Sequence, residues 1–195
     1  MSEKNIAELV FITDVSGSMQ PLQEDTIGGF NSVLEEYKSF GDNVRVTTVL
    51  FNQDVKELYL RVPISEVIPL DEENYCPGGT TALNDALGKT LNKIMSLQLS
   101  DSEGNKSQKT LVVVATDGQE NSSREYTLSA VSKMIETLQS NNGWEFLFQI
   151  QNLDVKTVAE NYCLSMDDVE LFEHSSAGER HSHASRSMRL MNFLY

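Results

Sequence analysis

The sequence has little of the chemistry that covalent cross-links and transition-metal centres require. Only two of its 195 residues are cysteines, Cys76 and Cys163, and they stand far apart in the chain. Two scattered thiols are too few for a disulfide framework or a zinc site. The three histidines, His174, His181 and His183, all stand near the end of the chain. A serine nucleophile needs a base, and no Gly-x-Ser-x-Gly pattern is present, so a serine hydrolase is disfavoured.

Positive charge is also scarce. The chain carries 15 Lys and Arg residues against 29 Asp and Glu residues, and its net charge is -14. Such a surface repels the phosphates of nucleic acids and of anionic lipids, so we expect neither as a partner. The same charge is compatible with cation binding and with basic protein partners, or it serves solubility alone.

Long hydrophobic runs are missing as well. No stretch approaches the length of a membrane span, about 18 apolar residues, and residues 1–5 lack the pattern of a signal peptide. We therefore expect a soluble, cytoplasmic protein. The apolar content of 39% is that of an ordinary globular chain. The length allows one sizeable core, which predicts a single domain over residues 1–195.

Strand-like and helix-like patterns alternate almost throughout the chain. Apolar runs and alternations predict six strands, at 8–13, 44–51, 55–62, 110–116, 144–150 and 169–172. Apolar residues three and four apart predict helices at 27–37, 83–94, 128–138 and 155–162. This alternation predicts an α/β fold with a mostly parallel sheet and helices on both faces.

The second and third predicted strands are joined by only three polar residues, 52–54, which predicts an antiparallel hairpin. In the third strand, Leu58, Leu60 and Val62 alternate with other residues. We expect these three side chains on one face of an edge strand.

The last part of the chain has a helical pattern at 179–193, with Ala184, Met188 and Met191 on one face. We expect the core of the domain at about 6–173. Residues 174–195 then form a C-terminal helix or tail.

Two of the predicted strands end in an aspartate: the first at Asp14 and the fourth at Asp117. Ligands of open α/β sheets bind outside the carboxyl ends of strands, where the strand order reverses. If the two strands are neighbours, both carboxylates lie at that point. Ser16 and Ser18 follow Asp14, and the loop 78–81 opens a helix at the same end of the sheet.

These segments offer two carboxylates and three hydroxyls. Hard oxygen donors suit Mg²⁺, Mn²⁺ or Ca²⁺ rather than zinc or copper. So few charges leave the cation partly uncompensated and with an open position, which would attract an incoming carboxylate. Glu120 and Asn121, which follow closely, either line the rim of this site or are plain polar loop residues.

Three segments, in this order, resemble the metal-ion-dependent adhesion site of von Willebrand factor A domains. They are Asp14-Val15-Ser16-Gly17-Ser18, Gly79-Thr80-Thr81-Ala82-Leu83 and Thr116-Asp117-Gly118. The resemblance runs from about Ile6 to Phe172 and looks closest to small, stand-alone bacterial and phage members. It implies a doubly wound, Rossmann-like sheet with one antiparallel edge strand.

The resemblance also implies which residues bind the metal. Ser16, Ser18 and a threonine bind it directly or nearly so, whereas Asp14 and Asp117 bind it directly or through water. The threonine of the family precedes the pattern x-Leu-x-x-Ala-Leu. Thr81 fits this pattern and Thr80 is one residue out of phase, so Thr81 is preferred. Otherwise either threonine is simply a helix N-cap.

We predict a divalent-cation-dependent protein-binding domain that is not an enzyme, in which an Asp or Glu of the partner completes the coordination of the metal. One alternative is a Mg²⁺-dependent phosphotransferase or phosphatase with Asp14 as nucleophile. Such enzymes usually need a second acid nearby and a lysine at a later strand end. Here Ser16 takes the place of the acid, and no lysine closely follows the late strands. A metal that only stabilises the fold is the third alternative.

Overall fold

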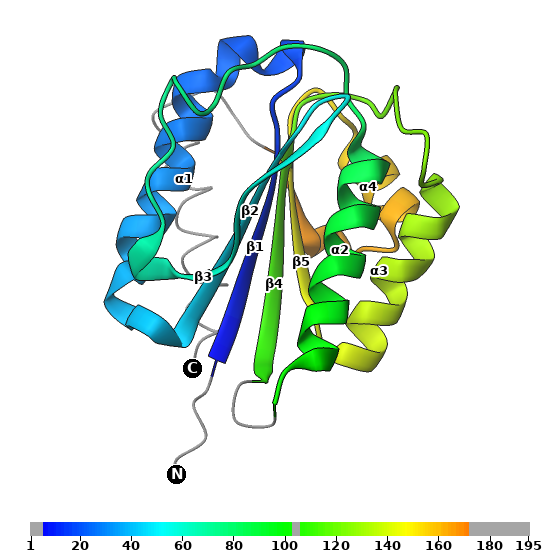
Figure 1. Ribbon diagram of the computed structural model, residues 1–195. Coiled ribbons are helices and arrows are strands. Elements are labelled where there is room, and N and C mark those ends of the chain that lie inside the picture. Colours follow the sequence, from blue (N-terminus) through cyan, green and yellow to red (C-terminus); the bar gives the residue numbers. More distant parts are fainter. Residues whose placement is uncertain (1–5, 103–105, 172–195) are drawn as a thin grey trace.

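A computed structural model describes residues 6–102 and 106–171 (Figure 1). Its strands form one sheet in the order β3-β2-β1-β4-β5-β6. They are β1 (Ile6–Asp14), β2 (Val44–Phe51), β3 (Val55–Pro63), β4 (Ser107–Thr116), β5 (Glu145–Ile150) and β6 (Val169–Leu171). Every neighbouring pair is parallel except β2 and β3. The predicted sheet, with its one antiparallel edge strand, is confirmed.

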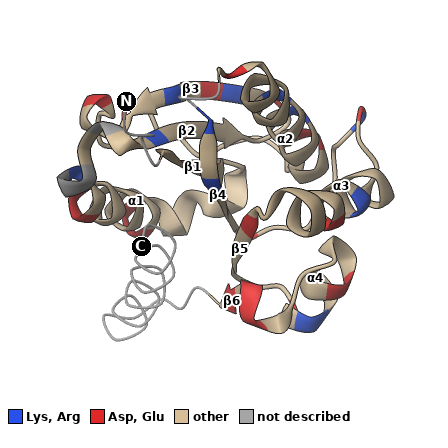
Figure 2. Ribbon diagram, turned by 90° about the horizontal axis from the view of Figure 1, so that it is seen from below, with Lys and Arg blue, Asp and Glu red and all other residues tan. Residues whose placement is uncertain are grey.

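Helices cover both faces of this sheet. Helix α1 (Gln23–Tyr37) lies on one face, and α2 (Leu83–Ser100), α3 (Leu128–Asn142) and α4 (Val155–Tyr162) lie on the other (Figures 1 and 2). Four short 3₁₀ turns complete the described part, at Gly17–Leu22, Lys38–Asn43, Ile64–Glu66 and Met166–Asp168. The arrangement confirms the predicted doubly wound α/β fold.

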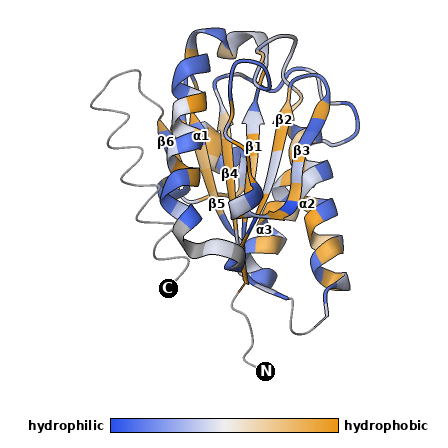
Figure 3. Cartoon of the chain, turned by 60° about the vertical axis from the view of Figure 1, so that its left-hand side comes forward, coloured by the Kyte–Doolittle hydropathy of each residue, from blue (hydrophilic) through white to orange (hydrophobic). Residues whose placement is uncertain are grey.

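Each face of the sheet has its own hydrophobic core. Leu87 and Leu91 of α2 pack with Phe148 of β5 in one core, and Phe30 and Leu34 of α1 belong to the other. Because both faces are covered, all nine residues of β1 are buried, as expected for a central parallel strand. Figure 3 shows the apolar residues concentrated in the strands, while the helices alternate between polar and apolar positions.

The strand order reverses between β1 and β4. The chain passes from β1 to β2 on one side and returns to β4 on the other. Thr13 pairs with Ala115 in the register of these two strands. Asp14 and Thr116 therefore leave the sheet side by side, at the place where ligands of such sheets bind.

The edge strand β3 does not alternate as the sequence predicts. Leu58 and Val62 pack against the core beneath α1, whereas Leu60 packs against the core beneath α2. The predicted common face of Leu58, Leu60 and Val62 is therefore wrong. The register between β2 and β3 shifts twice, and an extra residue at a bulge sends the following side chains to the other face of the strand.

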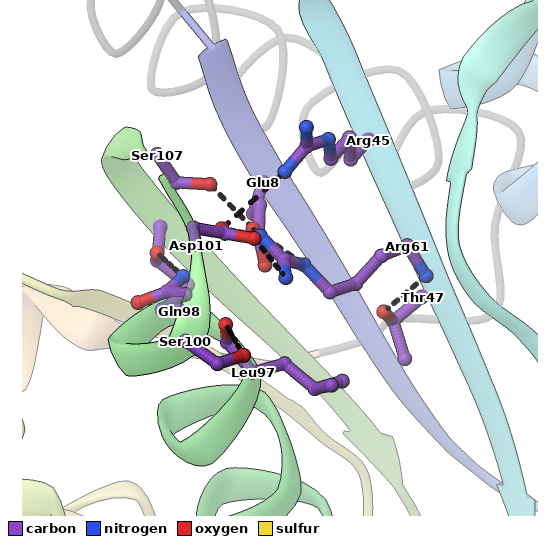
Figure 4. Close-up of polar contacts among 10 residues, drawn as sticks. Glu8, Arg45, Thr47, Arg61, Leu97, Gln98, Ser100, Asp101 and Ser107 are labelled. Carbon is purple, nitrogen blue, oxygen red and sulfur yellow. Dashed lines mark hydrogen bonds and ion pairs between the residues drawn. The ribbon is translucent and has the colours of Figure 1, made fainter. Parts of the chain in front are cut away.

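Arg61 occupies one of these bulges, with a φ of 51°. Its N–H donates a 3.0 Å hydrogen bond to the Thr47 hydroxyl. Its guanidinium donates to the buried Glu8 of β1 from Nε, over 2.8 Å, and it also binds Asp101 after α2 (Figure 4). The Ser107 hydroxyl of β4 donates to the same oxygen of Glu8. This cluster joins β1, β3, β4 and the end of α2 at the end of the sheet opposite the candidate site.

The terminal helix predicted at 179–193, with Ala184, Met188 and Met191, lies outside the described residues. The single domain over 1–195 stays a prediction, as do the core at 6–173 and the tail at 174–195. No helix in the described part of the chain is both long and apolar enough to cross a bilayer.

Candidate metal centre

Asp14 is the innermost residue of the site. Its side chain is 0% exposed, at the end of β1. Oδ1 accepts a 2.7 Å hydrogen bond from the N–H of Ser16, and Oδ2 accepts a 2.6 Å hydrogen bond from the Thr116 hydroxyl. Burial raises the pKa of Asp14, although these hydrogen bonds oppose the shift and nearby Asp117 adds to it. A cation beside Asp14 would relieve this cost of burying its charge.

Ser16, Ser18 and Asp117 form a polar chain across the carboxyl ends of β1 and β4. The hydroxyl oxygens of Ser16 and Ser18 lie 3.1 Å apart. The Ser18 hydroxyl donates a 2.7 Å hydrogen bond to Oδ1 of Asp117. Ser16 and Asp117 are buried and Ser18 is exposed, so the chain runs from the interior to the surface.

The two threonines of the third loop differ sharply in position. Thr81 is buried, and a side-chain carbon placed on Gly118 would lie 3.2 Å from its Oγ1 and 3.5 Å from Oγ of Ser18. The hydroxyls of Thr81 and Ser18 thus lie on the same side of Gly118. Thr80 is exposed, and its N–H donates to Oε1 of Gln53 on the β2–β3 turn. The structure therefore brings Thr81, and not Thr80, toward the other predicted ligands.

Neither threonine caps α2, so the helix N-cap alternative is wrong. The N-cap position is Ala82, which makes no side-chain capping bond. The first free N–H groups of the helix bind residues of the β4–α3 loop instead. Asn84 N donates to Oε2 of Glu120 over 2.8 Å, and Asp85 N donates to the Ser123 hydroxyl over 3.0 Å.

The β4–α3 loop also holds Thr81 in place. Oδ1 of Asn121 accepts from Thr81 N over 3.0 Å, and the N–H groups of Asn121 and Ser122 both donate to the Thr81 carbonyl. Glu120 accepts from Ser122 N and Ser123 N, which closes the loop on itself. The sequence left Glu120 and Asn121 open between residues of the rim and plain loop residues. In the structure Asn121 binds Thr81, whereas Glu120 binds its own loop and the start of α2.

Two further supports of Asp14 were not identified from the sequence. Thr116 binds its carboxylate, and the buried Tyr75 hydroxyl donates a 2.7 Å hydrogen bond to its main-chain carbonyl. Thr116 stands directly before Asp117, and a hydroxyl next to a predicted ligand could have been expected to bind within the site. Tyr75 carries no such signal, because 61 residues separate it from Asp14.

The donor set fits a hard divalent cation. Two carboxylates and three hydroxyls gather at one end of the sheet, and oxygen donors of this kind suit Mg²⁺, Mn²⁺ or Ca²⁺. None of the ion pairs found within the described residues involves Asp14 or Asp117. No group of three or more His, Cys, Asp or Glu able to hold a metal occurs in residues 6–102 and 106–171. A cation here would therefore depend on the hydroxyls.

The sequence profile of the von Willebrand factor type A domain family matches residues 8–186. The chain belongs to this family. Its VWA fold was therefore correctly expected from the three loop segments. No curated protein matches the chain at a significant level.

Solved structures share this VWA fold at low sequence identity. The pilus adhesin SpaC from Lactobacillus rhamnosus GG has a TM-score of 0.67 at 15% identity, over 96% of this chain and 31% of SpaC. The manganese-loaded TRAP protein of Plasmodium vivax has a TM-score of 0.65 at 16% identity, over 93% and 72% of the two chains. The D319A mutant of the PilB minor pilin from Streptococcus sanguinis has 0.62 at 11% identity, over 95% and 61%. The VWA chain thus spans less than two thirds of PilB and of SpaC.

Proposed function

We propose that this VWA domain binds Mg²⁺, or Mn²⁺ or Ca²⁺ in its place, and captures a partner protein through the bound ion. The metal ligands are Asp14, Ser16, Ser18, Thr81 and Asp117, directly or through water. An Asp or Glu side chain of the partner completes the coordination. The observation that carries the proposal is the chain of oxygens from Ser16 through Ser18 to Asp117, beside Thr81 and in no ion pair with a Lys or Arg of the described residues.

An open coordination position in this site favours an anionic ligand. Two of the five proposed ligands are carboxylates, which balance the formal charge of a divalent ion, and the three hydroxyls add none. Where Asp14 or Asp117 binds through water, the ion is less well compensated and attracts one more carboxylate, even though the protein as a whole carries a charge of -14. The exposure of Ser18 supports an open position that faces solvent.

The names of two structural neighbours support the same direction. One is a manganese-loaded protein and another is a pilus adhesin. Both are similar to this chain in fold alone. They support a proposal of metal-dependent protein binding without assigning a partner, and the cytoplasmic location expected from the sequence stays a prediction.

We propose no catalytic role for the site. Both oxygens of Asp14 accept hydrogen bonds, and the buried carboxylate has little freedom to attack a phosphoester. The alternative of a phosphotransferase or phosphatase predicts phosphoester turnover that Asp14→Asn abolishes. The alternative of a purely stabilising metal predicts a higher melting temperature with Mg²⁺ and no metal-dependent partner.

The proposal is tested in two steps on the same protein. Calorimetric titration with Mg²⁺ and with Mn²⁺ should show one site, lost in Asp14→Ala and retained in Glu136→Ala, a control that removes an exposed carboxylate of α3. Affinity capture from source cells should then recover a partner with Mg²⁺ but not with EDTA or with Asp14→Ala. A partner captured equally well in EDTA would refute the proposal.

A further inference from the structure

A cavity of about 450 Å³ opens beside the candidate metal centre. Its lining comes from the β4–α3 loop, the start of α2, β5 and α4, on the face of the sheet that α2, α3 and α4 cover. Its apolar wall consists of Leu83, Leu128, Phe148, Ile150, Leu153 and Val158. A volume of this size falls within the range of about 300–1,000 Å³ that is usual for ligand sites.

The cavity adjoins the candidate metal centre through two residues. Thr116, which binds Asp14, and Gly118 both line it. Gly118 also borders the hydroxyls of Thr81 and Ser18, since a side-chain carbon there would come within 3.5 Å of both. Gly118 therefore borders both the predicted metal ligands and the cavity, so one bound partner segment could contact both.

The cavity has a polar group at its inner end. Asn84 is only 4% exposed, and its Oδ1 accepts a 3.2 Å hydrogen bond from the hydroxyl of buried Tyr162. The amide of Asn84 lines the cavity, and the NH₂ of an amide can donate a hydrogen bond to an acceptor on a ligand.

The charges around the cavity disfavour a second anionic group. Among the described residues that line it there is no Lys or Arg, and the two acidic ones are Glu120 and Asp154. Glu120 accepts hydrogen bonds from its own loop, and Oδ1 of Asp154 caps α4 through Thr157. Both carboxylates keep their negative charge, which repels a further anion. The exposed part of Leu128, at 37%, leaves apolar surface at the mouth instead.

We propose that this cavity receives an aromatic or long aliphatic side chain of the same partner whose carboxylate binds the metal. Nδ2 of Asn84 then donates to a main-chain carbonyl of that partner. Apolar anchors seated in pockets contribute much of the affinity at protein interfaces. The inference rests on the proposed function and adds to it: the partner carries an acid and an apolar anchor close together.

Small carboxylates with and without a phenyl group test this pairing. Phenylacetate, 3-phenylpropanoate and 4-phenylbutanoate are titrated against acetate, propanoate and butanoate, in Mg²⁺ and in EDTA, with methyl NMR on the whole chain as the readout. We expect at least one phenyl compound to bind about tenfold more tightly than its alkyl counterpart. It should shift the methyl signals of Leu128, Leu153 and Val158, and EDTA should remove the binding of both.

Two variants and one matched control locate the effect. Leu153→Asp and Leu128→Asp should each abolish the preference for phenyl while leaving the Mg²⁺-dependent binding of the alkyl carboxylate unchanged. Leu99→Asp, at a 76% exposed leucine of α2 that does not line the cavity, should keep the preference. If Leu153→Asp does not fold, Leu128→Asp still tests the inference.

The outcomes separate the two proposals. Mg²⁺-dependent binding without a phenyl preference, or with one that survives both variants, overturns the inference and leaves the proposed function standing. Carboxylate binding that ignores EDTA overturns the proposed function, and the inference with it. If benzyl alcohol shifts the same methyl signals as strongly as the phenyl carboxylates, the cavity is an independent small-molecule site and the inference is again overturned.

Discussion

The Thr116 hydroxyl donates a 2.6 Å hydrogen bond to Oδ2 of Asp14, across 102 residues of sequence. It joins the carboxyl ends of β4 and β1 at the point where the strand order reverses. The second oxygen of Asp14 is held by Ser16 N within its own loop. One local and one long-range hydrogen bond therefore orient the innermost carboxylate of the site before any metal binds.

Thr116→Val removes the long-range hydrogen bond and leaves Oδ2 of Asp14 buried without a partner. We expect the free energy of unfolding to fall by about 1–3 kcal/mol in EDTA, and the affinity for Mn²⁺ to fall with it. Urea unfolding and calorimetry measure the two effects. Thr137→Val is the control, because that exposed hydroxyl donates to Lys133 O within its own helix α3. Equal stability of the two variants would show that Thr116 does not support Asp14.

Thr81→Val and Thr80→Val distinguish the two threonines as metal ligands. The buried hydroxyl of Thr81 lies with that of Ser18 beside Gly118, whereas Thr80 is exposed. We expect Thr81→Val to lower the affinity for Mn²⁺ at least about tenfold, as loss of a metal-supporting group typically does. Thr80→Val should leave it nearly unchanged. The reverse order in calorimetric titrations would assign the ligand to Thr80.

Asp85 makes the free energy of unfolding depend on pH in the acid range. Burial opposes its ionisation, but three main-chain N–H groups, those of residues 124–126, and the charge of Lys89 together lower its pKa below 3.8. A lowered pKa means that the unfolded chain binds the proton more readily. The stabilisation is complete above pH 3.8 and is lost as the pH falls through the lowered pKa.

Asp85→Asn removes the charge. It also places the NH₂ of the new amide against the N–H of Arg124, so that two donors face each other. At neutral pH we expect a loss of about 1–3 kcal/mol in the free energy of unfolding. The difference from the wild type should shrink as urea titrations are repeated at lower pH. Glu136→Gln, at an exposed site, should show a small difference at every pH. A constant deficit in Asp85→Asn would contradict the assignment.

Arg61→Met breaks the buried cluster at the opposite end of the sheet and leaves Glu8 without its charge partner. Because Arg61 is only 11% exposed, we expect a loss of about 3–5 kcal/mol. Lys93→Met removes the 50% exposed partner of Glu57 and should cost about 0–1 kcal/mol. Unfolding in urea compares them, and Glu8→Gln in the Arg61→Met background should restore part of the loss. Similar losses for the two single variants would exclude a special role for the buried pair.

The alternation of strands and helices could be predicted because each element buries a face of its own sequence. The consecutive apolar residues of β1, and the left-handed Gly143 after α3, depend on neighbours in the chain alone. The hairpin was predictable from the three residues between β2 and β3. The alternation within β3 was not, because the bulge at Arg61 depends on Thr47 and Glu8, which come from two other strands.

The sequence by itself determined the sheet, its helices and the three loops that carry Asp14, Thr81 and Asp117, because short-range patterns and a family resemblance mark them. Only the tertiary structure decided that Thr81 lies inside and Thr80 outside, and that Thr116 and Tyr75 hold Asp14. It also placed a cavity beside the site. These features depend on contacts between residues 37 to 102 positions apart, such as Thr116 with Asp14, and no local pattern specifies which distant residues will meet.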